Sequence, residues 1–400
     1  MDSTISATTA IKKHRYVFID VLRGLAVLWM VETHVVDVVL MKSFKSGWFY
    51  NLLNISNGFV AVAFLFCAGA GFWIAATRKA EDYRRFAPPL WQYLRRLGLI
   101  LLIAYWLHFP TMSFQRLFQL KWENWLSFFQ TDILQTIVYS SLFALILLLI
   151  VKNLNVLKWI YGLIALAVML ATPFIWNLDP FSFLHPFFAC WIARVPISKF
   201  PLFPWSAYFF AGAFFTAMFF QTENKEKLSR VLLIVGTALM LILFYTRSWT
   251  EFYPGYQDWW RVSPFHTLFR ISGTVAAFSL LYLIENWYKE KRIGKILQLC
   301  GQESLYIYVF HLLLVYGSIA NFGMRYYVGS RLDPFSTILI IIGLWVLSYF
   351  TALAWHQIKA TNIKTARWVM ASTFGVFFLI FLLKPRRNQK SFVGAIHKLP

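Results

Sequence analysis

The residues that could do chemistry are concentrated in the first apolar segment of the chain, residues 16–40. This segment holds one arginine, one histidine and three carboxylates in an otherwise apolar run: Asp20, Arg23, Glu32, His34 and Asp37. Charged side chains are costly inside a bilayer, and those that occur there line pathways or take part in reactions. The segment therefore predicts a membrane helix that contributes to a functional site.

The spacing of these residues predicts one polar face. Arg23 and His34 are eleven positions apart, which on a helix is about three turns and roughly 16 Å along the axis. Asp20 lies three residues before Arg23 and Asp37 three after His34, so each carboxylate can lie beside its partner. A polar stripe should face a protein interior. We expect Arg23 and His34 to project into one lipid-shielded tunnel, and we assign no role to Glu32, which lies on another face.

The predicted catalytic pair is His34 and Asp37. Histidine titrates near neutral pH, so His34 can act as a general base that removes a proton from an amine or hydroxyl. Asp37 could hold the ring in one tautomer, as the carboxylate of a catalytic triad does. The alternative is that His34 only forms a buried hydrogen bond between helices.

The composition predicts an integral membrane protein. Of the 400 residues, 59% are hydrophobic and 14% are charged, against about 25% charged in soluble domains. The net charge of +21 arises because Lys and Arg crowd the short loops on one side, as topology requires, so nucleic acid is not a predicted partner. The three cysteines are isolated, with no CxxC or His/Cys cluster, and neither a disulfide framework nor a metal site is indicated.

Apolar runs of membrane-spanning length predict an all-α, polytopic transmembrane bundle of 10–11 spans. Before the last span, Lys and Arg number 21 on the side where the chain begins and 10 on the other, which predicts a cytoplasmic N-terminus. Eleven spans would place five further cationic residues of 384–398 outside, so whether the last span is a full crossing stays open. We expect a cytoplasmic tail at 1–15, a membrane domain at 16–358, and an extra span with a basic tail at 359–400. The predicted spans lie near 16–40, 58–76, 97–110, 128–151, 158–176, 204–221, 231–247, 266–287, 303–322, 335–358 and 366–383.

Two arginines begin the third predicted span. Arg95 and Arg96 close the densest basic stretch of the chain, 78–96. Arginine forks match phosphate oxygens two at a time, so these two residues are candidates to bind coenzyme phosphates at the cytoplasmic entrance. The alternative is that they are topology signals that contact lipid headgroups.

Three further pairs of polar residues lie at helical spacing within predicted spans. We predict that they contact the acceptor substrate, with hydrogen bonds between helices as the alternative. An arginine in a span needs a partner, and an ion pair of Arg270 with Asp258 or Asp37 is an equal alternative. The pairs are Asp132 and Gln135, His266 and Arg270, and Ser304 and His311.

Several short motifs occur in an order that resembles the transmembrane acyltransferase superfamily, which includes the acyltransferase-3 proteins and the heparan-α-glucosaminide N-acetyltransferases. The opening helix of that group is similar to Asp20-Val-Leu-Arg23-Gly24-Leu-Ala26 with His34 after ten intervening residues. The likeness covers most of 15–358. The other matching stretches are Phe64-Leu-Phe66-Cys-Ala-Gly69, Leu94-Arg95-Arg96-Leu97, Asp132-Ile-Leu134-Gln135, Pro204-Trp205 through Gly212, and Gly301-Gln302-Glu303-Ser304-Leu305-Tyr306-Ile307-Tyr308 with His311.

This resemblance implies a reaction. Acyl-CoA, most simply acetyl-CoA, would donate its acyl group from the cytoplasmic side to a saccharide or glycolipid reached from the other side. His34 would be catalytic, and Arg23, with Asp20 beside it, would lie on the donor side. The predicted location is the cell (inner) membrane, among membrane lipids, and the sequence leaves the oligomeric state open.

The resemblance combines two branches of the superfamily. Animal glucosaminide enzymes carry their histidine in the loop after the first helix, whereas 41–57 contains none here. The Leu-Gln motif follows that branch, but the Arg-x10-His spacing follows the acyltransferase-3 proteins. Both N-acylation and O-acylation therefore remain open. The rival functions are a transporter or flippase for a polar lipid or sugar, since buried Arg, His and Asp also serve transport, and a catalytically silent subunit.

Overall fold

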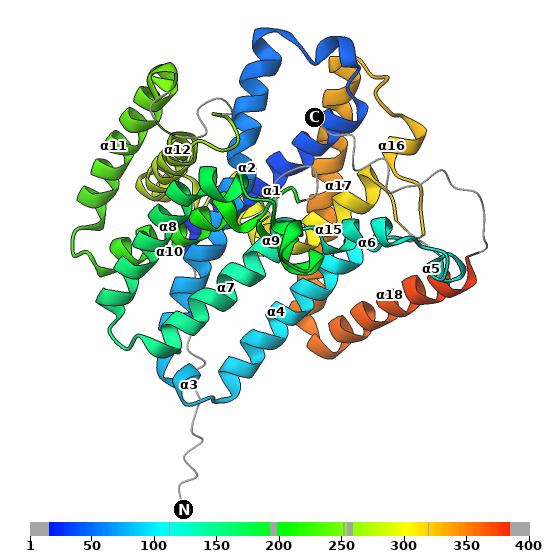
Figure 1. The fold of residues 1–400 in the computed structure, drawn as a ribbon, viewed down its shortest axis with the longest axis horizontal. Helices are drawn as coiled ribbons and strands as arrows, with labels where there is room; N and C mark the ends of the chain where they lie inside the picture. The colour runs from blue at the N-terminus through cyan, green and yellow to red at the C-terminus, as the bar shows by residue number, and fades with distance from the viewer. Residues whose placement is uncertain are drawn as a thin grey trace, which may run out of the picture.

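The protein is an all-helical bundle (Figure 1). The computed structural model describes residues 16–111, 113–192, 198–250, 253, 259–318 and 320–384. Over these residues the only extended pairings are the isolated bridges Leu40–Leu332 and Gly317–Phe322. The predicted fold class, a polytopic helical membrane protein, is confirmed.

Every predicted span coincides with a helix. The third helix begins at Pro88 rather than 97, because Pro88 and Pro89 suit a first helical turn. The ninth is broken at Glu303 and ends at Val315. The helices are α1 Val17–Val39, α2 Gly47–Thr77, α4 Pro88–Leu107, α7 Ile133–Ile150, α8 Leu154–Trp176, α10 Leu202–Gln221, α11 Lys225–Tyr245, α12 Pro264–Leu283, α14 Arg292–Gln302, α15 Ser304–Val315, α17 Pro334–Thr361 and α18 Ile363–Leu383.

Short helices occupy the connections. They are η1 Lys42–Phe44, α3 Ala80–Arg84, α5 Phe114–Leu117, α6 Trp122–Phe129, η2 Pro180–Ser182, α9 Pro186–Ile192, η3 Arg247–Thr250, α13 Glu285–Tyr288 and α16 Met324–Tyr327. Within the described ranges, seven helices are long and apolar enough to cross a membrane: α2, α7, α8, α10, α11, α17 and α18. α1 is also long enough, but its apolar sequence carries the acidic and basic residues Asp20, Arg23, Glu32 and Asp37 as well as His34.

The bundle has two ends. One, the N-terminal end, contains the start of α1 and the connections at 78–87, 151–153, 222–224 and 284–291. There Arg84 donates to the carbonyls of Leu148 and Val151 at the end of α7. The other, the His34 end, contains the connections at 40–46, 108–132, 198–201 and 316–333. There a hydrogen bond from Met41 N to the Leu332 carbonyl joins the first of these connections to the last.

Paired glycines set the two closest helix crossings. Where α1 meets α14, a Cβ atom on Gly24 would lie 2.0 Å from the Leu297 carbonyl oxygen, and one on Gly301 would lie 1.8 Å from the Asp20 carbonyl oxygen. Such distances are impossible for any larger residue, so only glycine permits this approach. The crossing fixes α1 in the middle of the bundle (Figure 1).

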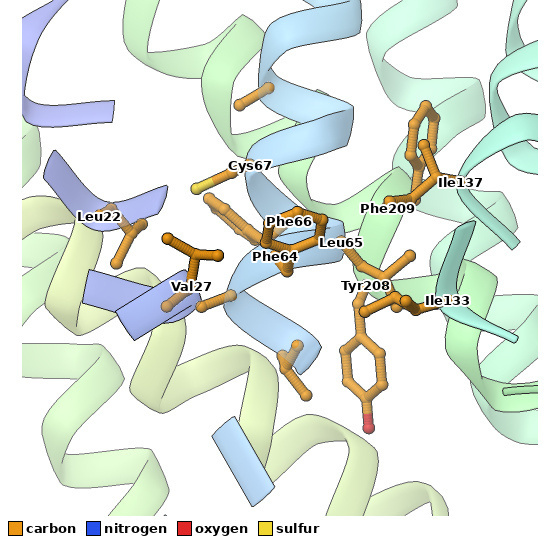
Figure 2. Packing of buried hydrophobic residues seen from close by; sticks show 14 of the residues in the cluster. Leu22, Val27, Phe64, Leu65, Phe66, Cys67, Ile133, Ile137, Tyr208 and Phe209 are labelled. Carbon is orange, nitrogen blue, oxygen red and sulfur yellow. The ribbon is translucent and has the colours of Figure 1, made fainter. Parts of the chain in front are cut away.

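The crossing of α2 and α10 is built in the same way. A Cβ on Gly69 would lie 1.9 Å from the Phe209 carbonyl oxygen, and one on Gly212 would lie 2.1 Å from that of Phe66. Figure 2 shows α2 between α1, which presents Leu22 and Val27, and the side chains of α7 and α10. The apolar core is therefore continuous from α1 through α2 to α10.

The last helix, α18, runs along the outside of the bundle (Figure 1). It buries only Ala366, and it contacts α4 through Phe374 and Phe377 on Trp106. At its end the Lys384 carbonyl accepts a hydrogen bond from Ser113 Oγ, 2.7 Å long. α18 therefore connects the N-terminal end of the bundle, where it starts, with the connection that contains Ser113. The tails at 1–15 and 385–400 lie outside the described residues.

Candidate active site

A large cavity opens into the His34 end of the bundle. Its volume is about 1240 Å³, and its walls come from α1, α2, α7, α10, α12 and α15 together with the connections at that end. His34, Asp132, Arg270 and Tyr308 line it. Helices that carry the quoted motifs, among them α1, α2, α10 and α15, therefore contribute to one chamber of a size that accommodates a small substrate.

His34 belongs to a hydrogen-bond chain that crosses from α1 to α15. Its Nδ1 lies 2.9 Å from Nε2 of His311, and Nδ1 of His311 lies 2.8 Å from the carbonyl oxygen of Ile307. The two imidazoles are nearly parallel, with ring centroids 5.1 Å apart. Tyr316 meets the ring of His34 edge-on at 5.6 Å.

This chain defines the tautomer of both rings when they are neutral. A carbonyl can only accept, so Nδ1 of His311 carries hydrogen and its Nε2 is an acceptor. Nδ1 of His34 must then donate to it, which leaves Nε2 of His34 with its lone pair. That nitrogen makes no hydrogen bond to any described residue, and His34 lines the cavity. The arrangement is suited to accepting a proton from a bound molecule.

Asp37 does not make the expected contact with His34. The ring is hydrogen-bonded by His311 instead, while the backbone carbonyl of Asp37 accepts from Lys45 Nζ at 2.5 Å. Asp37 does not line the cavity, although its charge interacts with Lys199 and Arg325, which do. The contact with His34 that we predicted for Asp37 is thus made by His311, 277 positions away.

A second histidine, His108, lines the same cavity and was not singled out from the sequence. Its Nε2 donates to Asp132 Oδ2 at 2.9 Å, and Nδ1 is hydrogen-bonded to the side-chain amide of Gln130. Asp132 also caps α7, where Oδ1 accepts from Ile133 N at 2.7 Å. The only signal in the sequence was a histidine at the end of a predicted span.

The remaining predicted acceptor residues separate into two groups. Asp132 and Arg270 line the cavity, and His311 is hydrogen-bonded to His34, which also lines it. The other three residues do not line the cavity. Gln135 completes the capping box of Asp132 and is buried. Ser304 is buried at the N-terminal end, and the ring of His266 packs against those of Trp259 and Phe269.

Two neighbouring residues, Gly58 and Trp205, define the position of the Arg270 side chain in the cavity wall. A Cβ on Gly58 would lie 2.7 Å from its Nη2, and its guanidinium lies over the ring of Trp205 at 5.7 Å. Among the described residues no carboxylate lies within ion-pair distance of Arg270, Asp37 included, and Asp258 lies outside the described residues.

The predicted donor residues gather at the opposite end. Arg23 lies 3.9 Å from Asp20, whose other oxygen accepts from Gln302 at 3.4 Å. Arg96 is close enough to Arg23 for the two charges to interact. The side chains of Arg95 and Arg96 are both exposed. None of the four predicted donor residues lines the cavity, so the shared tunnel expected for Arg23 and His34 is not one continuous space in this structure.

A buried ion-pair cluster at the N-terminal end was also missed. Glu303, whose side chain is 4% exposed, lies 2.7 Å from His356 Nδ1 and also pairs with Lys359. These contacts tie the break between α14 and α15 to α17. The acidic residue stood in a quoted motif, but nothing in the sequence indicated partners more than fifty positions away.

The fold and the cavity define an integral membrane protein with a polar site enclosed by its helices. The family described as heparan-alpha-glucosaminide N-acetyltransferase, catalytic, matches residues 15–246, and the chain belongs to this family. A second family, a protein of unknown function designated DUF418, matches residues 214–361. No curated protein matches the chain. The protein is thus a membrane-bound member of an acetyltransferase family.

Proposed function

We propose that the protein transfers an acyl group, acetyl in the simplest case, from acyl-CoA to an amine or hydroxyl of a saccharide or glycolipid held in the cavity. The observation that carries the proposal is the chain Ile307–His311–His34, which leaves Nε2 of His34 as an acceptor at the cavity wall. A general base needs this free lone pair within hydrogen-bond reach of its substrate.

The proposed step balances in protons and electrons. The acceptor nitrogen or oxygen attacks the thioester carbonyl while Nε2 of His34 takes its proton. The carbon–sulfur bond then breaks, and the imidazolium returns the proton to the CoA thiolate. His311 stabilises the imidazolium because its Nε2 accepts from Nδ1 of His34 throughout.

The donor is assigned to the N-terminal end. Arg23 and Arg96 place two guanidiniums near each other, a pairing that a phosphate would bridge. Their distance from His34, roughly 16 Å along α1, is similar to the length of a pantetheine arm. The thioester would pass the level of Phe64 and Tyr308, whose rings stack at 6.4 Å.

The proposal is tested with the full chain purified in detergent. Radiolabelled acetyl-CoA and a panel of amino sugars and hydroxylated glycans serve as donor and acceptors. We expect His34→Ala to lower kcat by about 10²–10⁴-fold, the usual contribution of general base catalysis. The matched control is His185→Ala, at an exposed histidine away from the cavity.

A second readout does not require the acceptor. CoA should raise the melting temperature of the wild type and of His34→Ala equally, but less in Arg96→Gln than in Arg85→Gln, an exposed control in the same basic stretch. Wild-type transfer by His34→Ala would remove His34 from the mechanism. A wild type that neither binds CoA nor transfers acetyl would contradict the acyltransferase function and favour transport of a polar lipid or sugar.

A further inference from the structure

The cavity wall carries a large excess of positive charge. Six cationic side chains line it, against the single carboxylate of Asp132: Arg116, Lys199, Arg247, Arg261, Arg270 and Arg325. Asp37 lies near Lys199 and Arg325, and the sequence places Glu251 and Asp258 in the adjoining connection. Even if all three of these carboxylates neutralised cavity cations, the excess would remain positive.

Only some of the cationic side chains in the cavity lie close to a carboxylate. Lys199 lies within electrostatic reach of both Asp132 and Asp37, and Arg325 within reach of Asp37. Arg270, Arg247 and Arg261 come from another part of the lining, formed by α12 and the connection between α11 and α12. The charges of Lys199 and Arg325 are therefore partly balanced by Asp132 and Asp37, whereas Arg270, Arg247 and Arg261 have no carboxylate within ion-pair distance among the described residues.

The guanidinium of Arg270 is held in place without a carboxylate among the described residues. Gly58 leaves room for it, Trp205 lies beneath it, and the side chain is half-buried. Arg247 is fixed by a 2.7 Å bond to the Phe244 carbonyl and by that residue's ring at 4.8 Å. An arginine within a membrane helix is costly when no carboxylate balances it, and pre-positioned forks are suited to binding an anion.

We propose that the acceptor carries a phosphate group, which binds to Arg270 with Arg247 and Arg261 while its sugar places the reacting amine or hydroxyl at His34. The inference rests on the proposed function and specifies its substrate class. Phosphate fits better than carboxylate because it carries about −1.5 to −2 charges and three acceptor oxygens, which several arginine forks can share. The phosphate can belong to a soluble sugar phosphate or to a lipid-linked saccharide in the bilayer.

The test measures anion binding by the full chain in detergent at constant ionic strength. The probes are inorganic pyrophosphate, glucosamine 1-phosphate, and micelles doped with farnesyl phosphate, with sodium acetate as the carboxylate probe. We expect the phosphate probes to bind and Arg270→Gln to weaken them about tenfold or more, the size of one charge-assisted hydrogen bond. Arg270→Lys should recover part of the loss.

Arg230→Gln is the matched control, since Arg230 lies on α11 and pairs with Glu226 at 2.5 Å in an exposed position. If Arg270→Gln does not fold, the exposed Arg247→Gln carries the same expectation. Preference for farnesyl phosphate identifies a lipid-linked acceptor, and preference for glucosamine 1-phosphate a soluble one. Acetate binding as tight as phosphate would overturn the inference.

The outcome is separable from failure of the proposed function. Equal phosphate binding by wild type, Arg270→Gln and Arg247→Gln, together with normal protection by CoA, overturns the phosphate acceptor and leaves the acyltransferase intact. A loss of CoA protection rather than of acceptor-probe binding in the Arg270 variant would also overturn it, because the wall would then bind the donor.

Discussion

At the scale of single residues, the proposed mechanism gives the two histidines different roles. His34 offers Nε2 to the cavity, and His311, which is fully buried, fixes the ring through the other nitrogen. A carboxylate in this position would stabilise the imidazolium more strongly. The neutral partner keeps a second charge out of an apolar region, where an uncompensated carboxylate is expensive.

His311→Ala tests this positioning function. We expect kcat to fall at least tenfold, because His34 loses the acceptor that fixes its tautomer, while KM for the acceptor changes little. His311→Gln should recover part of the rate, since its amide oxygen can accept from Nδ1 of His34. Steady-state kinetics over a pH range provide the measurement.

The pH profile separates positioning from a structural effect. Since the base must be neutral, the rate should fall as pH decreases through the pKa of His34, and replacing His311 should move this acidic limb. The groups that face His34 are His311 and Tyr316, with the charges of Lys199 and Asp132 nearby. An unchanged limb and a uniform loss in both variants would indicate that His311 only supports the fold.

The sequence predicted that Asp20 lies beside Arg23, as the structure shows, but it did not predict the partner of His34. The pairing of Asp20 with Arg23 follows from helical spacing, which is a local property. The contacts of His34 with His311 and of Asp132 with His108 join distant segments, and no spacing rule specifies them. Asp37 was selected because a carboxylate three positions after His34 shares its helix face, and three-dimensional packing placed His311 against the ring instead.

At the scale of helices, glycines from two different motifs meet at each of the two close helix crossings. Gly24 of the first motif meets the helix of Gly301 in the last, and Gly69 meets the helix of Gly212. Apolar runs were enough to predict where the helices lie, because hydropathy is read along the chain. Which helices cross could not be read this way, although the glycines that permit the crossings were visible.

Gly24→Ala tests the first crossing. The added methyl group would meet the Leu297 carbonyl oxygen at 2.0 Å, so α1 and α14 must separate, and overpacking of this kind is destabilising by about 1–3 kcal/mol. We expect a lower melting temperature in detergent and a smaller monodisperse fraction on size exclusion. Gly98→Ala is the control, since nothing lies within 4 Å of its Cβ position. Equal stability of the two variants would refute the close crossing.

At the scale of the whole molecule, the two candidate sites lie at opposite ends. The cavity opens at the His34 end, and the arginines assigned to the donor lie at the N-terminal end. This separation suits a reaction that uses a cytoplasmic donor and an acceptor on the other side. The proposed function therefore requires one orientation of the protein in the membrane.

Cysteine accessibility tests this orientation directly. The native Cys67, Cys190 and Cys300 are buried, with at most 1% of each exposed, so an introduced cysteine can be read without removing them. In intact cells, an impermeant maleimide should label Lys42→Cys at the His34 end and not Lys289→Cys at the N-terminal end; both positions are exposed. Lysed cells provide the control, in which both should react.

The same assay determines the side of the last helix. Because Lys384 is bonded to Ser113 at the His34 end, Lys384→Cys should follow Lys42→Cys, and the exposed Lys364→Cys at the start of α18 should follow Lys289→Cys. Labelling of Lys289→Cys in intact cells would reverse the orientation and place the cationic cavity on the cytoplasmic side, where CoA phosphates would compete for it. Labelling of Lys364→Cys and Lys384→Cys from one side only would instead show that α18 lies along the membrane surface and does not cross it.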